Sequence, residues 1–182
     1  MSRLLEKYRQ EIKPALQKEL NLSSIMAVPE LTKIVVSCGL GQANENPKLI
    51  DIAKENIMTI TGQMPVVTKS KQAISGFKLR QNQPIGLKVT LRKQRMYEFF
   101  DRLVNASLGR IRDFRGISPK AFDKSGQLNI GIREHTIFPE ISFEKTETVH
   151  GLQATLVFNN TNPEHNRLLM EKMGLPFEKK DK

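Results

Sequence analysis

The sequence predicts an α+β fold in which helices pack on one face of an antiparallel sheet. Segments with the two-residue period of strands mix with segments of helical period, without the regular strand–helix–strand order that builds a parallel sheet. One strand, residues 87–92, carries apolar and polar side chains on opposite faces, which is typical of an antiparallel sheet with one solvated face. A chain of 182 residues has the size of one domain, so we expect a single domain over residues 1–182.

The first third of the chain predicts two helices and a buried strand. Residues 3–20 repeat apolar side chains at helical spacing, so we expect an amphipathic helix that packs on the core and that Pro14 kinks or divides. The β-branched residues 32–38 predict a buried strand. A helix over 47–61 then follows, with an Asn-Pro start and a glycine at its end.

The middle of the chain predicts a short strand, a long loop and the amphipathic strand. Residues 65–68 predict a strand near a sheet edge, and residues 69–85 show no periodicity. A loop of that length is usually functional or mobile. In the strand that follows, one face holds Leu87, Val89 and Leu91, and the other offers cations and a hydroxyl: Lys88, Thr90 and Arg92.

The remaining segments predict two helices and two strands. Residues 95–108 form an apolar-faced helix that Gly109 ends, and residues 128–132 and 152–156 alternate as strands. Asn-Pro at 162–163 predicts the start of a last helix, which stops at Gly174. These elements complete the predicted α+β order.

The charge of the chain indicates a polyanionic partner. There are 29 Lys+Arg against 19 Asp+Glu, a net charge of +10, and residues 56–97 contain no acid at all. A solvated face usually mixes both signs, so a stretch without acids favours nucleic acid first and an anionic membrane surface second. Eight cations lie in this acid-free window: Lys69, Lys71, Lys78, Arg80, Lys88, Arg92, Lys93 and Arg95.

The sequence excludes several other classes. Cys38 is the single cysteine, so we expect a buried inert thiol, no disulfide, no multi-cysteine zinc site and a reducing compartment. The start of the chain lacks a signal-peptide pattern and no apolar run is long enough to span a bilayer, so we expect a soluble intracellular protein.

Motifs for catalysis are weak or absent. Gly39 and Gly41 follow a strand, but Asn44 stands where a dinucleotide fingerprint needs its third glycine, so a tight turn is favoured. Gly126 and Gly131 have phosphate-loop spacing without the Lys-Ser/Thr that grips phosphate. We expect no enzyme activity, no catalytic residue, no metal and no cofactor.

Three further segments could contact partners. Phe77, between small and cationic residues, either stacks on an unpaired base or anchors its loop in the core. A second basic cluster follows a helix end, where arginines also favour the helix dipole: Arg110, Arg112 and Arg115. Residues 133–150 are mildly acidic and could face a basic protein.

At these motifs the chain resembles the bacterial L-five family of large-subunit ribosomal proteins, which bind 5S ribosomal RNA. The resemblance rests on residues 74–80 (Ile-Ser-Gly-Phe-Lys-Leu-Arg), 84–92 (Pro-Ile-Gly-Leu-Lys-Val-Thr-Leu-Arg) and 110–116 (Arg-Ile-Arg-Asp-Phe-Arg-Gly). Shorter matches at 28–29, 61–63 and 131–140 follow the same order, and together they extend from about residue 3 to Phe177.

The resemblance implies a curved antiparallel sheet backed by helices, within one ribosomal RNA-binding domain. It implies a structural protein of the cytoplasmic ribosome that binds 5S ribosomal RNA in the central protuberance of the large subunit. The family usually has Asn-Met where this chain has Ser37-Cys38. Together with the basic window, the resemblance predicts these 5S RNA-binding residues: Ser37, Gln63, Phe77, Lys69, Lys71, Lys88, Thr90 and Arg92.

The resemblance also implies further partners. These are 23S ribosomal RNA, other proteins of the central protuberance, and a protein of the small-subunit head in an intersubunit bridge. Arg110, Arg112 and Arg115 are the candidates for other RNA or bridge contacts. The family loop that reaches transfer RNA in the peptidyl site matches ten residues here: Ser75, Gly76, Phe77, Lys78, Leu79, Arg80, Gln81, Asn82, Gln83 and Pro84.

Overall fold

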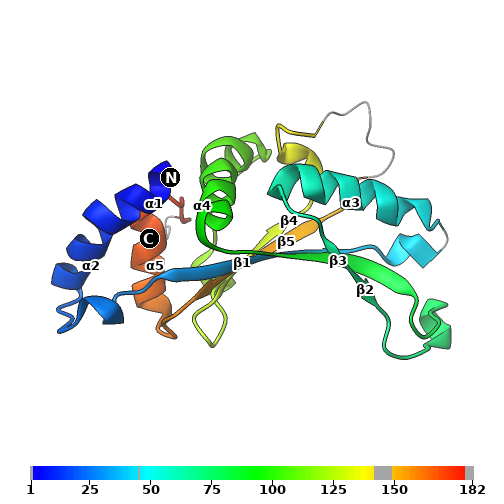
Figure 1. Cartoon of the computed structure of the whole chain (residues 1–182), viewed down its shortest axis with the longest axis horizontal. Coiled ribbons are helices and arrows are strands. Elements are labelled where there is room, and N and C mark those ends of the chain that lie inside the picture. Colours follow the sequence, from blue (N-terminus) through cyan, green and yellow to red (C-terminus); the bar gives the residue numbers. More distant parts are fainter. Residues whose placement is uncertain (1, 45, 142–148, 179–182) are drawn as a thin grey trace. The chain divides into compact units, whose positions relative to one another are not determined.

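The computed structural model describes residues 2–44, 46–141 and 149–178 (Figure 1). The chain divides into two compact units. The first unit holds Met1–Ile34, Arg92–Ile130 and Thr155–Lys182, and the second holds Val35–Leu91 and Gly131–Ala154.

Five strands form one antiparallel sheet in the order β2-β3-β1-β5-β4. This confirms the predicted α+β fold and antiparallel sheet. Val66 pairs with Lys88 and Val67 with Leu87, and β2 lies at the edge, as the sequence predicts. The strands are β1 (Leu31–Gly39), β2 (Val66–Lys69), β3 (Pro84–Leu91), β4 (Leu128–Ile132) and β5 (Leu152–Phe158).

In the first unit, the N-terminal helix is divided. α1 (Arg3–Lys7) continues into a π-helical turn, η1 (Tyr8–Ile12), and then into α2 (Lys13–Glu19). Pro14 lies in the first turn of α2. Because proline has no N–H to donate and its ring crowds the carbonyl four residues earlier, a regular α-helix does not continue through it, and the change of helix type falls just before it.

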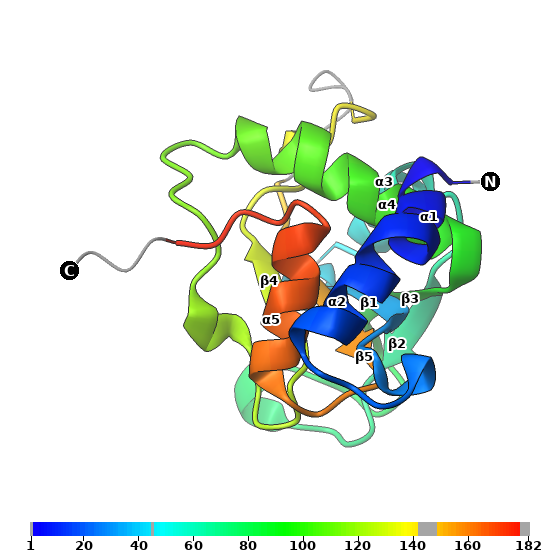
Figure 2. The same ribbon diagram turned by 90° about the vertical axis from the view of Figure 1, so that its left-hand side faces the viewer.

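The N-terminal helix is tied to two other helices of its unit. Its predicted apolar stripe is buried at Leu4, Tyr8, Ile12 and Leu16. Figure 2 shows α2 beside α5 (Pro163–Lys172), where the Lys172 Nζ lies 2.7 Å from Glu19 Oε2. Arg3 reaches Asp101 of α4 (Lys93–Arg102), with 3.2 Å between Nη2 and Oδ1.

The other helices of the first unit agree with the sequence prediction except in their ends. α4 is extended by a π-helical turn, η5 (Leu103–Ser107), and a 3-10 turn, η6 (Leu108–Arg110). Asn162 caps α5 by accepting the Glu164 N–H at 3.0 Å. Two further 3-10 turns are η2 (Ile25–Ala27) and η7 (Pro119–Ala121).

In the second unit, α3 (Lys48–Thr61) covers one face of the strands (Figure 1). The Asn46 side chain accepts the Lys48 N–H at 3.2 Å, and Gly62 ends the helix with a φ of 67°. Short 3-10 turns stand before α3 and after β4, namely η3 (Gly41–Asn44) and η8 (His135–Ile137). The buried face of α3 is apolar: Leu49, Ile50, Ala53, Ile57 and Ile60.

β3 begins earlier than predicted and ends one residue sooner. It starts at Pro84, so residues 84–86 belong to the strand and not to the loop, and Arg92 stands after it as the N-cap of α4. A β-carbon on Gly86 would lie 2.6 Å from the Cys38 carbonyl oxygen. Gly86 is therefore required by the close approach of β3 and β1.

The loop between β2 and β3 has more local structure than its sequence indicates. Ile74 and Leu79 exchange both backbone hydrogen bonds, at 3.0 and 3.1 Å, and η4 (Ser75–Phe77) forms the turn between them. At the base, the Ser70 N–H donates to Gln83 O at 2.8 Å. Nested turns have no hydrophobic period, which is why periodicity did not predict them.

Two imidazoles stack in the second unit. The His135 and His150 ring centroids are 3.8 Å apart with 12° between the planes, and His135 is fully buried. His135 Nδ1 accepts the His150 backbone N–H at 3.3 Å, and Asn56 Nδ2 lies 3.4 Å from Nε2. Burial lowers the pKa of His135, because a charged ring would lose its hydration there.

The Gly86→Ala variant should lose stability. Its methyl group would overlap a backbone oxygen that cannot turn away, so we expect the free energy of unfolding to fall by about 2 kcal/mol, measured by urea denaturation. Gly109→Ala is the matched control, since its β-carbon meets nothing within 4 Å. Equal stability of the two variants would contradict the close approach of β3 and β1.

The His135→Phe variant should weaken the acid sensitivity of the fold. The unfolded chain takes up a proton near the ordinary histidine pKa of 6.5, whereas folded His135 resists it. Neutral His135 therefore costs the folded state nothing above about pH 6.5, and the free energy of unfolding falls as the pH drops below that value. Urea unfolding from pH 7.5 to 5 should show a smaller loss in the variant, and identical slopes would exclude His135 as the source.

Candidate nucleic-acid interface

The outer face of β3 carries the polar side chains that the sequence predicts. Leu87, Val89 and Leu91 are at most 2 % exposed, whereas Lys88 is exposed and Thr90 is half-buried. Since successive side chains of a strand point to opposite faces, Lys88 and Thr90 lie on the face away from α3. The predicted alternation is confirmed.

The neighbouring edge strand adds an apolar side chain to this face. Val66 stands opposite Lys88 in the pairing of β2 with β3, so the two side chains lie on the same face. Val66 is 69 % exposed, and Met64 just before β2 is 60 % exposed. The face therefore combines a cation and a hydroxyl with apolar surface open to solvent.

Gln63 joins the end of α3 to β3. Its side-chain Nε2 donates to the Thr90 carbonyl at 3.4 Å, and its backbone N–H donates to Thr61 Oγ1 at 3.3 Å. The left-handed Gly62 turns the chain so that this contact forms. Gln63 thus supports the strand segment that carries Thr90.

Ser37 lies on β1 with its side chain on the face opposite Cys38. Cys38 is buried and its pKa is raised to about 11 by loss of hydration, which confirms the predicted inert thiol. Ser37 is half-buried. Because β1 pairs directly with β3, Ser37 and Thr90 stand on adjacent strands.

The β2–β3 loop presents exposed cations and an exposed aromatic ring. Phe77 is 70 % exposed and Ile74 is 45 % exposed, so Phe77 is not a core anchor. Lys71, Lys78 and Arg80 are exposed along the same loop. The Arg80 N–H donates to Gln83 Oε1 at 2.9 Å, which holds the second half of the loop in its turn.

The predicted site residues fall into both units. The second unit holds Ser37, Gln63, Lys69, Lys71, Phe77, Lys88 and Thr90, together with the loop 75–84. Arg92 belongs to the first unit, as do three exposed arginines at and after the end of η6: Arg110, Arg112 and Arg115. In the mildly acidic segment 133–150, residues 142–148 lie outside the described residues.

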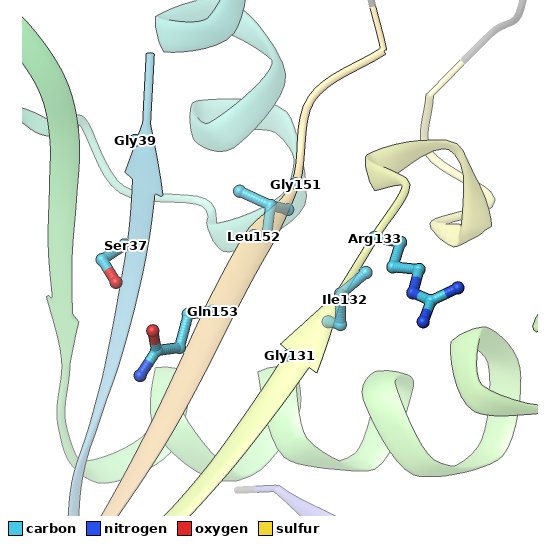
Figure 3. Close-up of a pocket in the computed structure, with 8 residues that line it drawn as sticks. All are labelled: Ser37, Gly39, Gly131, Ile132, Arg133, Gly151, Leu152 and Gln153. Atoms are coloured by element: carbon cyan, nitrogen blue, oxygen red, sulfur yellow. The ribbon is translucent and has the colours of Figure 1, made fainter. Parts of the chain in front are cut away.

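A shallow hollow on β1, β5 and β4 was not predicted from the sequence. It has a volume of about 420 Å³ and lies wholly within the second unit (Figure 3). In the sequence, the signal that could have indicated it is the presence of glycines in or next to three predicted strands. Its lining residues are Ser37, Gly39, Gly131, Ile132, Arg133, Gly151, Leu152 and Gln153.

Two searches of the described residues were negative. Among residues 2–44, 46–141 and 149–178, no three His, Cys, Asp or Glu side chains gather closely enough to hold a metal ion. No helix in this part of the chain has the length and apolar character needed to cross a membrane.

Comparison with known proteins shows the family. The profile described as "ribosomal L5P family C-terminus" matches residues 84–177, and the profile "Ribosomal protein L5" matches residues 24–80. The chain belongs to the ribosomal protein L5 family. These L5 profiles include the amphipathic strand β3 and the basic loop before it as far as Arg80.

Full-length relatives of the L5 family agree. The large ribosomal subunit protein uL5 of Citrifermentans bemidjiense is 52% identical over 177 residues, 97% of this chain and 99% of that protein. The uL5 proteins of Natranaerobius thermophilus and Halothermothrix orenii are 48% and 50% identical over the same shares of each chain. The predicted resemblance, the assignment as a structural ribosomal protein and the absence of enzyme function are confirmed.

Proposed function

We propose that the outer face of β1, β2 and β3 binds 5S ribosomal RNA in the large ribosomal subunit. The observation that carries this proposal is the one-sided strand β3, which offers Lys88 and Thr90 on one face while its other face is fully buried. Membership of the L5 family supports a ribosomal RNA partner, since ribosomal RNA binding is typical of that family.

The chemistry of this face suits an irregular RNA surface. Thr90 and Ser37 supply hydroxyls that can donate and accept, and Gln63 supports the Thr90 strand. Neutral hydrogen-bonding groups of this kind read base edges and ribose hydroxyls, while Lys69, Lys88 and Arg92 contribute charge to phosphates. Binding thus combines a salt-dependent part with a part that depends on fit.

The β2–β3 loop is proposed to contact transfer RNA in the peptidyl site. Exposed Phe77 can stack on an unpaired base, and Lys78 and Arg80 on the same turn can hold the adjoining phosphates. The base of the loop is held by the hydrogen bond from the Ser70 N–H to Gln83 O, and we propose that the contact of its tip with transfer RNA is separable from the sheet face.

We propose that residues 1–182 act as one RNA-binding domain. Within this domain, the remaining partners are assigned to other parts of the chain. Three exposed arginines at and after the end of η6 suit 23S ribosomal RNA or an intersubunit bridge: Arg110, Arg112 and Arg115. The acidic segment 133–150 is the candidate for a protein of the small-subunit head, with exposed Glu134 in its described part.

Titration against 5S ribosomal RNA and an unrelated hairpin of equal length tests the proposal across a salt series. We expect a preference for 5S RNA that persists at moderate salt, because fit and not charge alone supplies it. Equal and steeply salt-dependent affinities for both RNAs would reduce the protein to a general polycation.

The Thr90→Ala variant should bind 5S RNA about fivefold more weakly, the cost of roughly 1 kcal/mol for one hydrogen bond. Its salt slope should stay nearly unchanged, because no charge is removed. Thr32→Ala, an exposed threonine of β1 in the other unit, is the matched control and should bind like the wild type. Unchanged affinity of Thr90→Ala would remove Thr90 from the site.

The Lys78→Ala plus Arg80→Ala variant should keep 5S RNA binding and lose contact with transfer RNA. The measurement is chemical protection of peptidyl-site transfer RNA on ribosomes assembled with the variant. Lys120→Ala plus Lys124→Ala removes the same charge from exposed positions of the first unit and serves as the control. Loss of 5S binding in the loop variant would place the loop at the 5S interface instead.

A further inference from the structure

We propose that the C-terminal segment is a strap that positions the exposed arginines near the end of η6 for contact with RNA. The strap is residues 175–178, which follow α5, and the segment that it holds is residues 110–117, here called the arginine loop. Figure 2 shows the C-terminal segment leaving α5 toward the segment that follows α4. The inference rests on the RNA contact proposed for the three arginines of this loop, and it adds a positioning residue, Phe177.

The strap pairs with the end of the arginine loop through a short parallel bridge. The Ile117 N–H donates to the Pro176 carbonyl at 2.9 Å, and the Glu178 N–H donates to the Ile117 carbonyl at 3.1 Å. The Ile117 side chain is buried, so both its backbone and its side chain are held. The arginine loop is therefore tied to the end of the chain, although β4, β5 and α5 lie between them in the sequence.

The arginine loop is fixed at both of its ends. At its start, the Ile111 N–H donates to the Leu108 carbonyl of η6 at 3.2 Å, and at its end the strap binds Ile117. Between these points, residues 112–116 have no hydrogen-bond or ion-pair partner among residues 2–44, 46–141 and 149–178. The strap is thus one of the two fixed points between which Arg112 and Arg115 are exposed.

Gly116 shows how closely the strap approaches the loop. A β-carbon on Gly116 would lie 2.5 Å from the Glu178 backbone nitrogen and 2.6 Å from the Phe177 carbonyl carbon, and its φ is 114°. Gly174 also has a positive φ, 92°, but its β-carbon would meet nothing within 4 Å. The strap itself therefore requires glycine at position 116, directly after Arg115.

Phe177 anchors the strap to the rest of the first unit. The Phe177 and Phe122 ring centroids are 6.1 Å apart with 21° between the planes, and the Arg167 guanidinium carbon lies 5.5 Å from the Phe177 centroid. Arg167 is itself held on α5, with 2.8 Å between its Nε and Glu171 Oε1. Stacked rings and a cation over a ring both favour the docked position of Phe177.

A fixed loop gives its arginines a selectivity that charge alone does not supply. Three arginines against one acid, Asp113, favour a polyanion over a basic protein. A loop that is already ordered loses less conformational freedom on binding, and its guanidinium groups meet phosphates only in a matching arrangement. Releasing the strap would leave every charge in place, so it should remove selective contact and keep general attraction to RNA.

Hydrogen exchange on the full chain measures the strap directly. Phe177→Ala should speed the exchange of the Ile117 amide about tenfold, since local opening of the strap becomes easier by about 1.4 kcal/mol. Phe177→Tyr keeps the ring and should exchange like the wild type. Glu178→Ala keeps the backbone N–H that bonds to Ile117 and is the second control. Unchanged exchange of the Ile117 amide in Phe177→Ala would overturn the strap.

Ribosomes assembled with the same variants test the positioning of the arginines. Arg112→Ala plus Arg115→Ala, the arginine variant, should lose chemical protection of 23S ribosomal RNA at the nucleotides that face the loop. Phe177→Ala should lose the same protections, and Phe177→Tyr should keep them. Toward an unrelated RNA hairpin, Phe177→Ala should bind like the wild type with the same salt slope, whereas the arginine variant should lower that slope by about two phosphate contacts.

The outcomes distinguish the strap from the proposed function. If the arginine variant loses 23S protections and Phe177→Ala keeps them, the arginine contact stands and the strap inference is overturned. If neither variant loses a protection, the proposed RNA contact of the arginines fails and their positioning fails with it. If the arginine variant keeps all protections but its large subunits no longer join small subunits, the loop contacts a protein and the inference for RNA is overturned.

A second pair of variants decides if Phe177→Ala does not fold. Gly116→Ala places a methyl group against the strap backbone, whereas Gly174→Ala introduces a positive-φ alanine without that contact. We expect faster exchange of the Ile117 amide and loss of the 23S protections in Gly116→Ala only. Equal behaviour of the two variants would overturn the inference.

Discussion

Leu87, Val89 and Leu91 occupy the face of β3 that α3 covers, and this one-sided burial decides what the opposite face can do. A strand with period two cannot hide Lys88 or Thr90 without exposing its apolar residues, so a slip of one residue would exchange the two faces. Two contacts hold β3 in that register. Gln63, which follows Gly62 at the end of α3, donates a hydrogen bond to the Thr90 carbonyl, and the edge strand β2 pairs with β3 on its other side. The polar face is therefore as well determined as the core.

Glycine serves two different purposes in this sheet. Gly86 allows the β3 backbone to approach the Cys38 carbonyl, an internal need that any side chain would violate. Gly39 and Gly131 meet nothing inside the protein, and their missing side chains instead open the outer surface. The same residue type thus stabilises a strand pair at one position and shapes a surface at two others, and only the surroundings of the β-carbon distinguish these cases.

The charges of the second unit are divided between two kinds of surface. The loop carries Lys71, Lys78 and Arg80 around an exposed Phe77, which suits strongly salt-dependent contact with a single strand. The sheet face is mostly neutral, with hydroxyls, amides, open glycines and exposed Val66, which suits contact that depends on shape and hydrogen bonds. The cations of the acid-free window are therefore divided between two surfaces of different physical character.

The sequence by itself determined the features that depend on neighbouring residues. The alternation of β3, the capped ends of α3 and α5, the division at Pro14 and the acid-free window are local, so periodicity, caps and counts predicted them. The nested turns of residues 70–83 were not predicted, because backbone hydrogen bonds leave no hydrophobic period in the sequence. The role of Gly86 and the hollow on β1, β5 and β4 were decided only by tertiary structure. The hollow brings together residues as distant in the chain as Ser37, Gly131 and Gln153, and no local pattern records which strands become neighbours.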